Sequence, residues 1–221
     1  MSNKKLVYDI ETITPRFTGE PGVFPPLTFH EIVTIAIVLE EEGSITYGNI
    51  RGNTEKELIG NFIQLIDDNR PELVSFNGRG FDLPCVLLRC LKYGLVFSRY
   101  GDYSHRYNSK HTDLYDLMNN YGASRNGGLD PLANLIGLPG KGAMDGSQVN
   151  QYVSEGRIKE VEDYCLLDSI QTYLLYNDYH TCIGEMDKAD YLRIVDFFSL
   201  KAQTDKRLEC LKLSHLRSKY E

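Results

Sequence analysis

Apolar runs separated by a polar turn dominate the first fifty residues of the chain. The run at 5–10 and the run at 32–38, the second rich in β-branched residues, each predict a buried strand. An acidic turn at 40–43 precedes a third candidate strand at 44–50. Together these segments predict an antiparallel meander at the start of a sheet.

Helical periodicity begins after the third strand. Thr54, with Glu57 three residues later, predicts a capping box at the start of a helix that reaches residue 67. A strand at 73–76 and a helix over about 81–93 follow. Because this order adds parallel strands to the meander, we expect an α/β fold with a mixed central β-sheet flanked by α-helices.

The second half of the chain is mainly helical in pattern. Long helices are predicted near 158–179 and about 188–216, the latter as a C-terminal helix that packs on the domain. Glycine-rich interruptions at 127–128 and 137–146 predict loops or turns, because helical patterns resume within a few residues. Residues 1–221 are therefore predicted to form a single domain with a helical C-terminal part.

The segment 12–28 holds four prolines and two glycines, which predicts an irregular loop near the surface.

The cysteines and the start of the chain indicate the cellular location of the protein. The five cysteines are widely spaced without a CxxC pair, so we expect mostly buried, reduced thiols rather than zinc ligands. With no signal-like start and no apolar stretch of membrane-spanning length, a cytoplasmic location and no membrane partner are expected.

The net charge of −7 comes from 24 Lys and Arg against 31 Asp and Glu. The basic footprint of a simple nucleic-acid-binding protein is therefore missing. A metal-dependent nuclease remains compatible with this charge, because clustered acids that bind divalent cations contribute to it and the bound cations reverse the local field.

Asp9 and Glu11 lie at the end of the first predicted strand. The period of two in a strand places both carboxylates on one face, where they can share a metal. Two acids this close repel each other unless a cation joins them. The alternative interpretation is a solvated strand end.

Two further acids follow predicted strands or lie on a predicted helix. Asp82 comes after a strand and glycine-rich turn residues, a place where ligands gather in α/β sheets, although it is equally suited to cap its helix. Tyr164 and Asp168 are i and i+4, so the phenol and the carboxylate can address one point. An amphipathic helix with a partly buried Tyr would give the same pattern.

In this order, the three segments resemble the Tyr-containing branch of the DEDD exonuclease superfamily, whose motifs are Asp-x-Glu, Asn-x-x-x-Phe-Asp and Tyr-x-x-x-Asp. They read 9–11, 77–82 and 164–168 here, with every motif residue present. The resemblance is closest to the proofreading exonuclease domain of family B DNA polymerases and to stand-alone bacterial exonucleases related to it. It covers nearly the whole chain and implies a ribonuclease H-like fold.

The resemblance also implies a 3'-5' exonuclease that releases nucleoside monophosphates from the 3' end of DNA, with single-stranded DNA as the expected substrate. Its expected cofactors are two Mg²⁺ or Mn²⁺ ions, metals that oxygen ligands favour. The implied metal ligands are Asp9, Glu11, Asp82 and Asp168. Tyr164 is expected to orient the attacking water, because a pKa of about 10 makes a phenol a poor base at neutral pH.

Other residues are candidates for substrate contacts. Asn77 and Phe81 are expected to position the terminal nucleotide, the Phe by stacking or wedging. The segment 99–111 interleaves aromatic and basic residues, which suits a single strand or, equally, an exposed hairpin. Lys141 can contact the phosphate backbone or remain solvated, and Asp113 can support the site, although a helix cap is the simpler interpretation.

Three alternatives stay open against this expectation. RNA is the second candidate substrate, because nothing in the sequence identifies a reader of the 2'-hydroxyl. A non-catalytic scaffold that binds nucleic acid or protein would show a substituted metal ligand, and none is seen. An ATP-binding fold would want a glycine-rich loop directly after the first strand, whereas the glycines after Asp9 begin at Gly19. A separate polymerase or helicase is a further expected partner.

Overall fold

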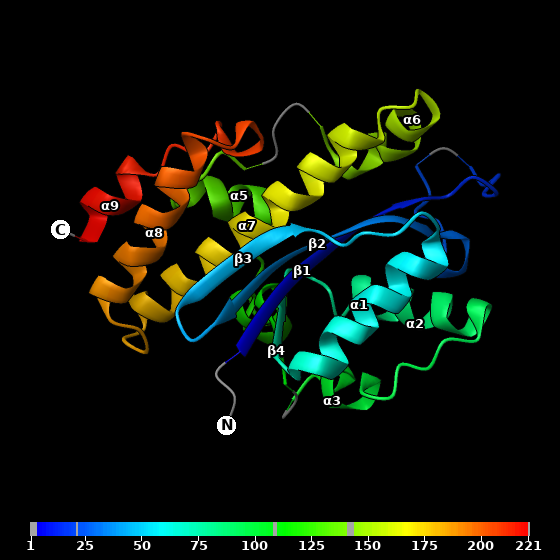
Figure 1. Ribbon diagram of the computed structural model, residues 1–221, viewed down its shortest axis with the longest axis horizontal. Helices are drawn as coiled ribbons and strands as arrows, with labels where there is room; N and C mark the ends of the chain where they lie inside the picture. The colour runs from blue at the N-terminus through cyan, green and yellow to red at the C-terminus, as the bar shows by residue number, and fades with distance from the viewer. Residues whose placement is uncertain (1–3, 21, 108–109, 141–143, 221) are drawn as a thin grey trace.

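The computed structural model describes residues 4–20, 22–107, 110–140 and 144–220. A mixed sheet with the order β3-β2-β1-β4-β5 lies at its centre (Figure 1). β1 pairs antiparallel with β2 and parallel with β4, so the predicted mixed sheet is confirmed. The strands are β1 (Lys4–Ile13), β2 (Glu31–Glu41), β3 (Ser44–Asn49), β4 (Glu72–Ser75) and β5 (His111–Asp113).

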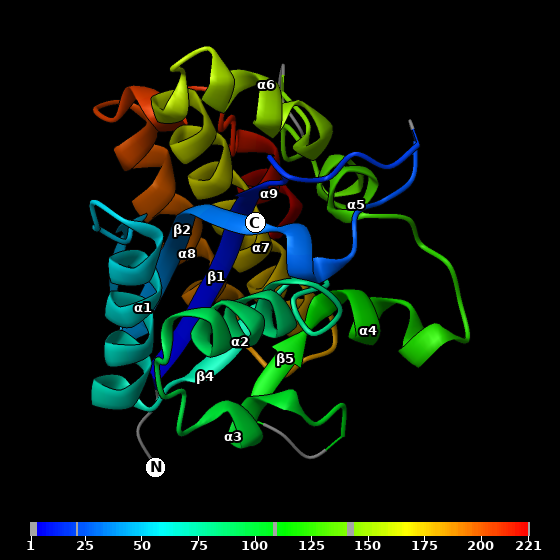
Figure 2. The same cartoon turned by 90° about the vertical axis from the view of Figure 1, so that its right-hand side faces the viewer.

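Helices cover both faces of the sheet. Helices α1, α2 and α3 lie on one side, and α7, α8 and α9 lie on the other (Figures 1 and 2). The helices are α1 (Glu55–Asn69), α2 (Asp82–Tyr93), α3 (Tyr100–Ser104), α4 (Leu114–Met118), α5 (Leu129–Leu135), α6 (Val149–Ser154), α7 (Ile158–Cys182), α8 (Lys188–Ala202) and α9 (Ser214–Tyr220). None of those in the described ranges is both long and apolar enough to cross a membrane.

The alternation of side chains along β1 divides the core into two layers. Val7 packs in the cluster formed by α7 and α8, whereas Tyr8 packs with Phe62 of α1 on the opposite face. Asp9 and Glu11 follow Val7 at the strand period, so they belong to the face that α7 covers. The same alternation that builds the core therefore points the two acids at one helix.

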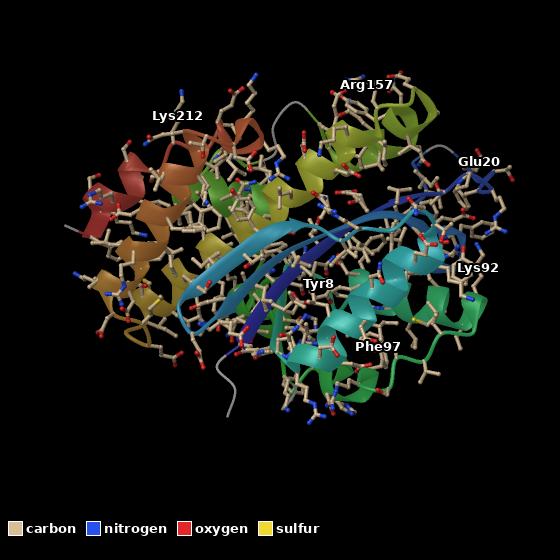
Figure 3. All side chains as sticks on the ribbon, viewed as in Figure 1. Tyr8, Glu20, Lys92, Phe97, Arg157 and Lys212 are labelled. Carbon is tan, nitrogen blue, oxygen red and sulfur yellow. The ribbon has the colours of Figure 1, made fainter. Side chains whose placement is uncertain are left out.

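The positions of side chains follow this layering. Figure 3 shows Tyr8 inside, between the sheet and the helices, whereas Arg157 and Lys212 lie at the periphery. The ring centroids of Tyr8 and Phe62 lie 5.2 Å apart, and Tyr8 is 1% exposed. Burial of such aromatic pairs stabilises the sheet against α1.

The start of α1 differs in one detail from the predicted capping box. Thr54 accepts a hydrogen bond from the Glu57 N–H at 3.2 Å, as expected. The Glu57 carboxylate, however, accepts from the N–H of Asn53 at 2.7 Å rather than from that of Thr54. The capping interaction therefore extends one residue further towards the N-terminus than predicted.

The continuous C-terminal helix predicted over 188–216 is wrong. α8 ends at Ala202, and Asp205 then caps the short 3-10 turn η4 (Lys206–Leu208) by accepting from the Arg207 N–H. Asp side chains compete in this way with helical hydrogen bonding. α9 begins only at Ser214 and is held to α7 by Asp178, which accepts from Lys219 and Tyr220.

The cysteines follow the expectation for most positions. Cys85, Cys90 and Cys165 are buried, whereas Cys182 and Cys210 are exposed, and all are free thiols. Burial of Cys165 places its thiol against β1, where it donates to the carbonyl of Asp9 at 3.4 Å. The thiol thus packs α7 onto the strand that carries the acids.

Candidate functional site

The central strand β1 extends beyond its parallel neighbour β4. The pairing of the two strands ends at Val7 and Val74, whereas β1 continues to Ile13. On the other side, the register between β1 and β2 shifts after Glu11, which leaves Val33 as an extra residue. Such bulges often lie beside active sites, because they change the direction of side chains. The end of β1 that carries the two acids therefore lies in an opening beyond the residues that pair with β4.

Helix α7 crosses this opening and brings a third carboxylate to β1. One oxygen each from Asp9, Glu11 and Asp168 lie within 4.8 Å of one another, and we refer to these three residues as the carboxylate cluster. The Oδ2 atom of Asp9 is buried and finds no hydrogen-bond partner among the described residues. A buried, unpaired oxygen next to two further carboxylates fits a divalent cation that prefers oxygen ligands.

Asp82 lines the same cleft but stands outside this cluster. It is the first residue of α2, and Phe81 rather than Asp82 occupies the N-cap position. Its Oδ1 instead accepts from the N–H of Ile10 at 3.1 Å, beyond the end of the β1–β4 pairing. The predicted alternative placed Asp82 at the N-cap, a position that Phe81 occupies, and the hydrogen bond to Ile10 fixes Asp82 against β1.

The acids of the cleft repel one another. Burial, followed by the charges of Asp82, Glu11 and Asp168, raises the pKa of Asp9 well above its usual value. Burial also raises the pKa of Asp82 to about 7, against the lowering effect of its backbone hydrogen bonds. Neither Asp9 nor Asp82 pairs with a Lys or Arg within the described part of the chain. A bound cation would relieve this repulsion.

Tyr164 lies in the cleft one helical turn before Asp168. Burial and then the charges of Asp168, Glu11 and Asp9 raise the pKa of the phenol far above its usual value. The hydroxyl therefore stays protonated at neutral pH. It can donate a hydrogen bond, but it cannot serve as a base.

Asn77 holds a turn in the left-handed backbone region, with φ of 63°. Its N–H donates to Asp113 Oδ1 at 2.8 Å, and the N–H of Arg79 donates to Asp113 Oδ2 at 2.9 Å. Asp113 also caps α4 by accepting from the Tyr115 N–H, as the simpler interpretation predicted. The additional bonds to the turn were not expected, because they join residues more than thirty positions apart.

Phe81 forms an aromatic group with two residues that sequence reasoning missed. Its ring centroid lies 5.9 Å from that of Phe24 and 5.1 Å from that of His30, both in edge-on arrangements. Phe24 is 69% exposed, and the His30 ring is held by the Thr12 hydroxyl at 2.7 Å. The only local signal for this loop was its prolines, which predict irregular backbone but not its position over the cleft.

One cleft of about 1290 Å³ is lined by Asp9, Glu11, Asp82, Asn77, Phe81, Tyr164 and Asp168. Gln171, which is fully buried, anchors the glycine-rich loop to α7. Its side-chain amide accepts from the Gly140 N–H at 2.7 Å and donates to the Gly140 carbonyl at 3.1 Å. Lys141 lies outside the described residues.

The described residues of the aromatic and basic segment 99–111 contain no hairpin. Residues 100–104 form α3, and His111 is the first residue of β5. Tyr103 is buried and donates to the carbonyl of Pro71 at 3.1 Å, and His111 is also buried. Only part of the segment, including Arg106 and Tyr107, remains at the surface.

Fold and site together define a ribonuclease H-like protein with an acidic candidate metal site at the end of its central strand. Residues 22–209 match a family described as predicted 3'-5' exonucleases related to the exonuclease domain of PolB. The chain belongs to this family. The matched range begins after Asp9 and Glu11, so the place of these two acids in the site comes from the geometry.

Similar curated proteins include DNA polymerases. A DNA polymerase of Archaeoglobus fulgidus is 24% identical over 207 residues, which cover 87% of this chain and 25% of the polymerase. One of Thermococcus aggregans is 33% identical over 110 residues, covering 46% of this chain and 6% of the polymerase. The chain thus spans a quarter or less of these relatives.

A solved structure shares the fold. The family B DNA polymerase of the hyperthermophilic archaeon Pyrobaculum calidifontis superposes with a TM-score of 0.61 at 16% identity. The superposition covers 90% of this chain and 29% of the polymerase. The ribonuclease H-like fold expected from the sequence is confirmed.

Proposed function

We propose that this protein removes nucleoside monophosphates from the 3' end of single-stranded DNA, with two Mg²⁺ or Mn²⁺ ions held by its carboxylates. The carrying observation is the unpaired, buried Oδ2 of Asp9 within the carboxylate cluster. A structural role would be better served by a hydrogen-bonded or neutral side chain, since unpaired buried carboxylates destabilise a fold.

The proposed metal ligands are Asp9, Glu11, Asp82 and Asp168. Bound divalent ions would supply Lewis-acid stabilisation of the charge that develops on the scissile phosphate. Asp82 is held ready for this role by its bond to the Ile10 N–H. The protonated hydroxyl of Tyr164 would orient the attacking water by donating or accepting a hydrogen bond beside Asp168.

The aromatic group at the other wall of the cleft suits the terminal nucleobase. Phe81 and the exposed Phe24 offer ring faces and edges beside the acids, and base stacking on such rings tolerates any sequence. Asn77, fixed by its turn, would contact the terminal nucleotide. DNA is proposed over RNA because the relatives are named as DNA polymerases.

End-labelled oligonucleotides test the proposal directly. Wild-type protein is incubated with 5'-labelled and 3'-labelled single-stranded DNA and matched RNA, in Mg²⁺, Mn²⁺ or EDTA. We expect 5'-labelled DNA to shorten stepwise and 3'-labelled DNA to release a labelled mononucleotide, both only with metal.

A matched pair of variants separates chemistry from folding. Asp168→Asn should abolish cleavage, whereas Asp178→Asn on the same helix should retain it, because Asp178 bonds Lys219 and Tyr220 away from the cleft. Failure of the wild type to cleave either polymer would favour a non-catalytic scaffold. Faster cleavage of RNA would reassign the substrate.

A further inference from the structure

Two tyrosine rings meet at the surface beyond the cleft. Tyr107 follows α3, and Tyr121 lies in the 3-10 turn η2 (Asn120–Gly122). Their ring centroids are 5.3 Å apart, and the residues are 66% and 43% exposed. Such a pair leaves aromatic surface in water, where the rings are available for stacking.

The backbone at η2 is held in an unfavourable conformation that presents Tyr121. Asn120 and Tyr121 have φ of 47° and 54°. This left-handed backbone region is energetically unfavourable for residues that carry a side chain. Buried Asn119 fixes the turn by donating to the carbonyl of Tyr115 and accepting from the N–H of Asn126. The exposed ring is therefore part of a built turn.

Positive charge accompanies the rings. Arg106 lies with its guanidinium 5.8 Å from the Tyr121 ring centroid and bonds Asp116 at 2.6 Å. Arg125, four residues after Tyr121, is exposed and forms no ion pair within the described ranges. Aromatic faces with neighbouring guanidinium groups are the composition that binds single-stranded nucleic acid without sequence preference.

The tyrosine pair is connected to the proposed active site. Tyr115, at the start of α4, lines the cleft, and so do residues 127–131 at the start of α5. Tyr121 lies in η2, on the segment that joins α4 to α5, and Figure 2 shows the path of this segment between the two helices. Arg106, whose guanidinium lies over the Tyr121 ring, bonds Asp116, the residue after Tyr115, so the tyrosine pair adjoins this wall of the cleft.

We propose that Tyr107, Tyr121 and Arg106 form a second binding site that stacks unpaired bases on the 5' side of the terminal nucleotide. This inference rests on the proposed nuclease function, because it assumes that the cleft holds the 3' end. The site would hold a long strand between successive cleavage steps. It would add nothing to the hydrolysis of a substrate with a single nucleotide.

Substrates of two lengths test the inference. Tyr107→Ala and Tyr121→Ala should each raise KM for a single-stranded 20-mer about 10-fold with little change in kcat, the size expected for losing one stacked base. Both variants should hydrolyse p-nitrophenyl thymidine 5'-monophosphate like the wild type. Tyr121→Phe, which keeps the ring, should restore the KM for the 20-mer.

Fluorescence anisotropy of the labelled 20-mer in EDTA provides a readout without catalysis. Weaker binding by both alanine variants supports the site, even where the wild type cleaves nothing and the proposed nuclease function fails. Unchanged binding and KM would overturn the inference while leaving the exonuclease intact, and would turn attention to a protein ligand for the tyrosines. Equal losses on both substrates would also overturn it, because they indicate a disturbed fold.

Discussion

Among the carboxylates of the described residues that are withdrawn from water, Glu55 and the carboxylate cluster have opposite kinds of partners. Glu55 at the start of α1 is surrounded by donors, whereas the carboxylate cluster of Asp9, Glu11 and Asp168 faces other acids. Both groups lie beside strands of the same sheet. The difference is therefore one of partners rather than of position or residue type.

Glu55 receives four hydrogen bonds within one small region. Arg89 donates to both of its oxygens at 2.6 and 2.5 Å, Tyr93 donates at 2.6 Å, and the N–H of Ile32 donates at 2.7 Å. Burial by itself would raise the pKa of Glu55, but these hydrogen bonds lower it below its usual value. The carboxylate is thus satisfied and ties α1, α2 and β2 together.

The comparison teaches how to separate a structural acid from a functional one. A buried carboxylate with a complete set of donors contributes to the fold, and removing one partner leaves the others unpaired. Acids whose pKa is raised by burial and by neighbouring carboxylates are destabilised in their charged form, and a bound cation can relieve this. Asp9 and Asp82 belong to the second kind, because their pKa values are raised and no Lys or Arg of the described residues pairs with them.

The largest expected effect is a loss of exonuclease activity in a variant that still folds. Asp82→Asn should reduce exonuclease activity at least about 10³-fold, because it removes a ligand charge with little change of volume. Glu55→Gln, assayed at a temperature where it remains folded, should keep activity near that of the wild type. Steady-state rates on 5'-labelled DNA measure both, and full activity of Asp82→Asn would remove this residue from the site.

The free energy of unfolding should respond in the reverse order, with a loss at Glu55 rather than at Asp82. Glu55→Gln should lower the free energy of unfolding by about 3 kcal/mol, because the guanidinium of Arg89, with a side chain 3% exposed, loses its counter-charge. Urea unfolding followed by circular dichroism measures the change. A loss below about 1 kcal/mol would show that the network contributes little.

An effect of intermediate size on exonuclease activity is expected at the turn that carries Asn77. Asp113→Asn replaces one accepting oxygen by an amide that cannot accept from the Arg79 N–H. We expect kcat to fall about 10-fold while metal binding is retained, because the turn positions Asn77 and Phe81 rather than the ions. Equal losses in metal affinity and in kcat would show a broader disturbance.

The smallest expected effect is a pH dependence of stability without metal. The folded-state pKa of Asp82 is about 7 and the unfolded value about 3.9, so the folded protein binds this proton more tightly. Its destabilising effect is therefore present above pH 7 and disappears as the pH falls towards 4. In EDTA, Asp82→Asn should melt a few degrees above the wild type at pH 8, and this difference in melting temperature should be smaller at pH 5.

Glu55 should show the opposite sign. Its folded-state pKa is lowered, so its stabilising contribution is present above the unfolded value and is lost as the pH falls through the folded value. The stability difference between wild type and Glu55→Gln should shrink in acid. A difference that grows below pH 5 would contradict the assigned network.

Local sequence patterns predicted those features that depend on neighbours along the chain. The period of two placed Asp9 and Glu11 on one face, and the i, i+4 spacing placed Tyr164 and Asp168 on another. The strand and helix order predicted the mixed sheet, because parallel strands need helical crossovers. These features depend on one segment at a time.

Features that depend on distant contacts escaped prediction. Phe24 reaches the cleft because its loop packs against Phe81, nearly sixty residues away. Gln171 holds Gly140 through a buried amide whose partner no spacing rule identifies. The break after Ala202 depends on the competition between Asp205 and helical hydrogen bonding, which composition alone does not decide.

Titration with Mn²⁺ tests the central claim most directly. Calorimetry on the wild type, Asp168→Asn and Glu55→Gln compares a member of the carboxylate cluster with the satisfied carboxylate under identical conditions. We predict that Asp168→Asn weakens Mn²⁺ binding at least about 10-fold and that Glu55→Gln leaves it unchanged. Equal Mn²⁺ affinity in the wild type and Asp168→Asn, or no Mn²⁺ binding by the wild type, would contradict the assignment of the cluster as the metal site.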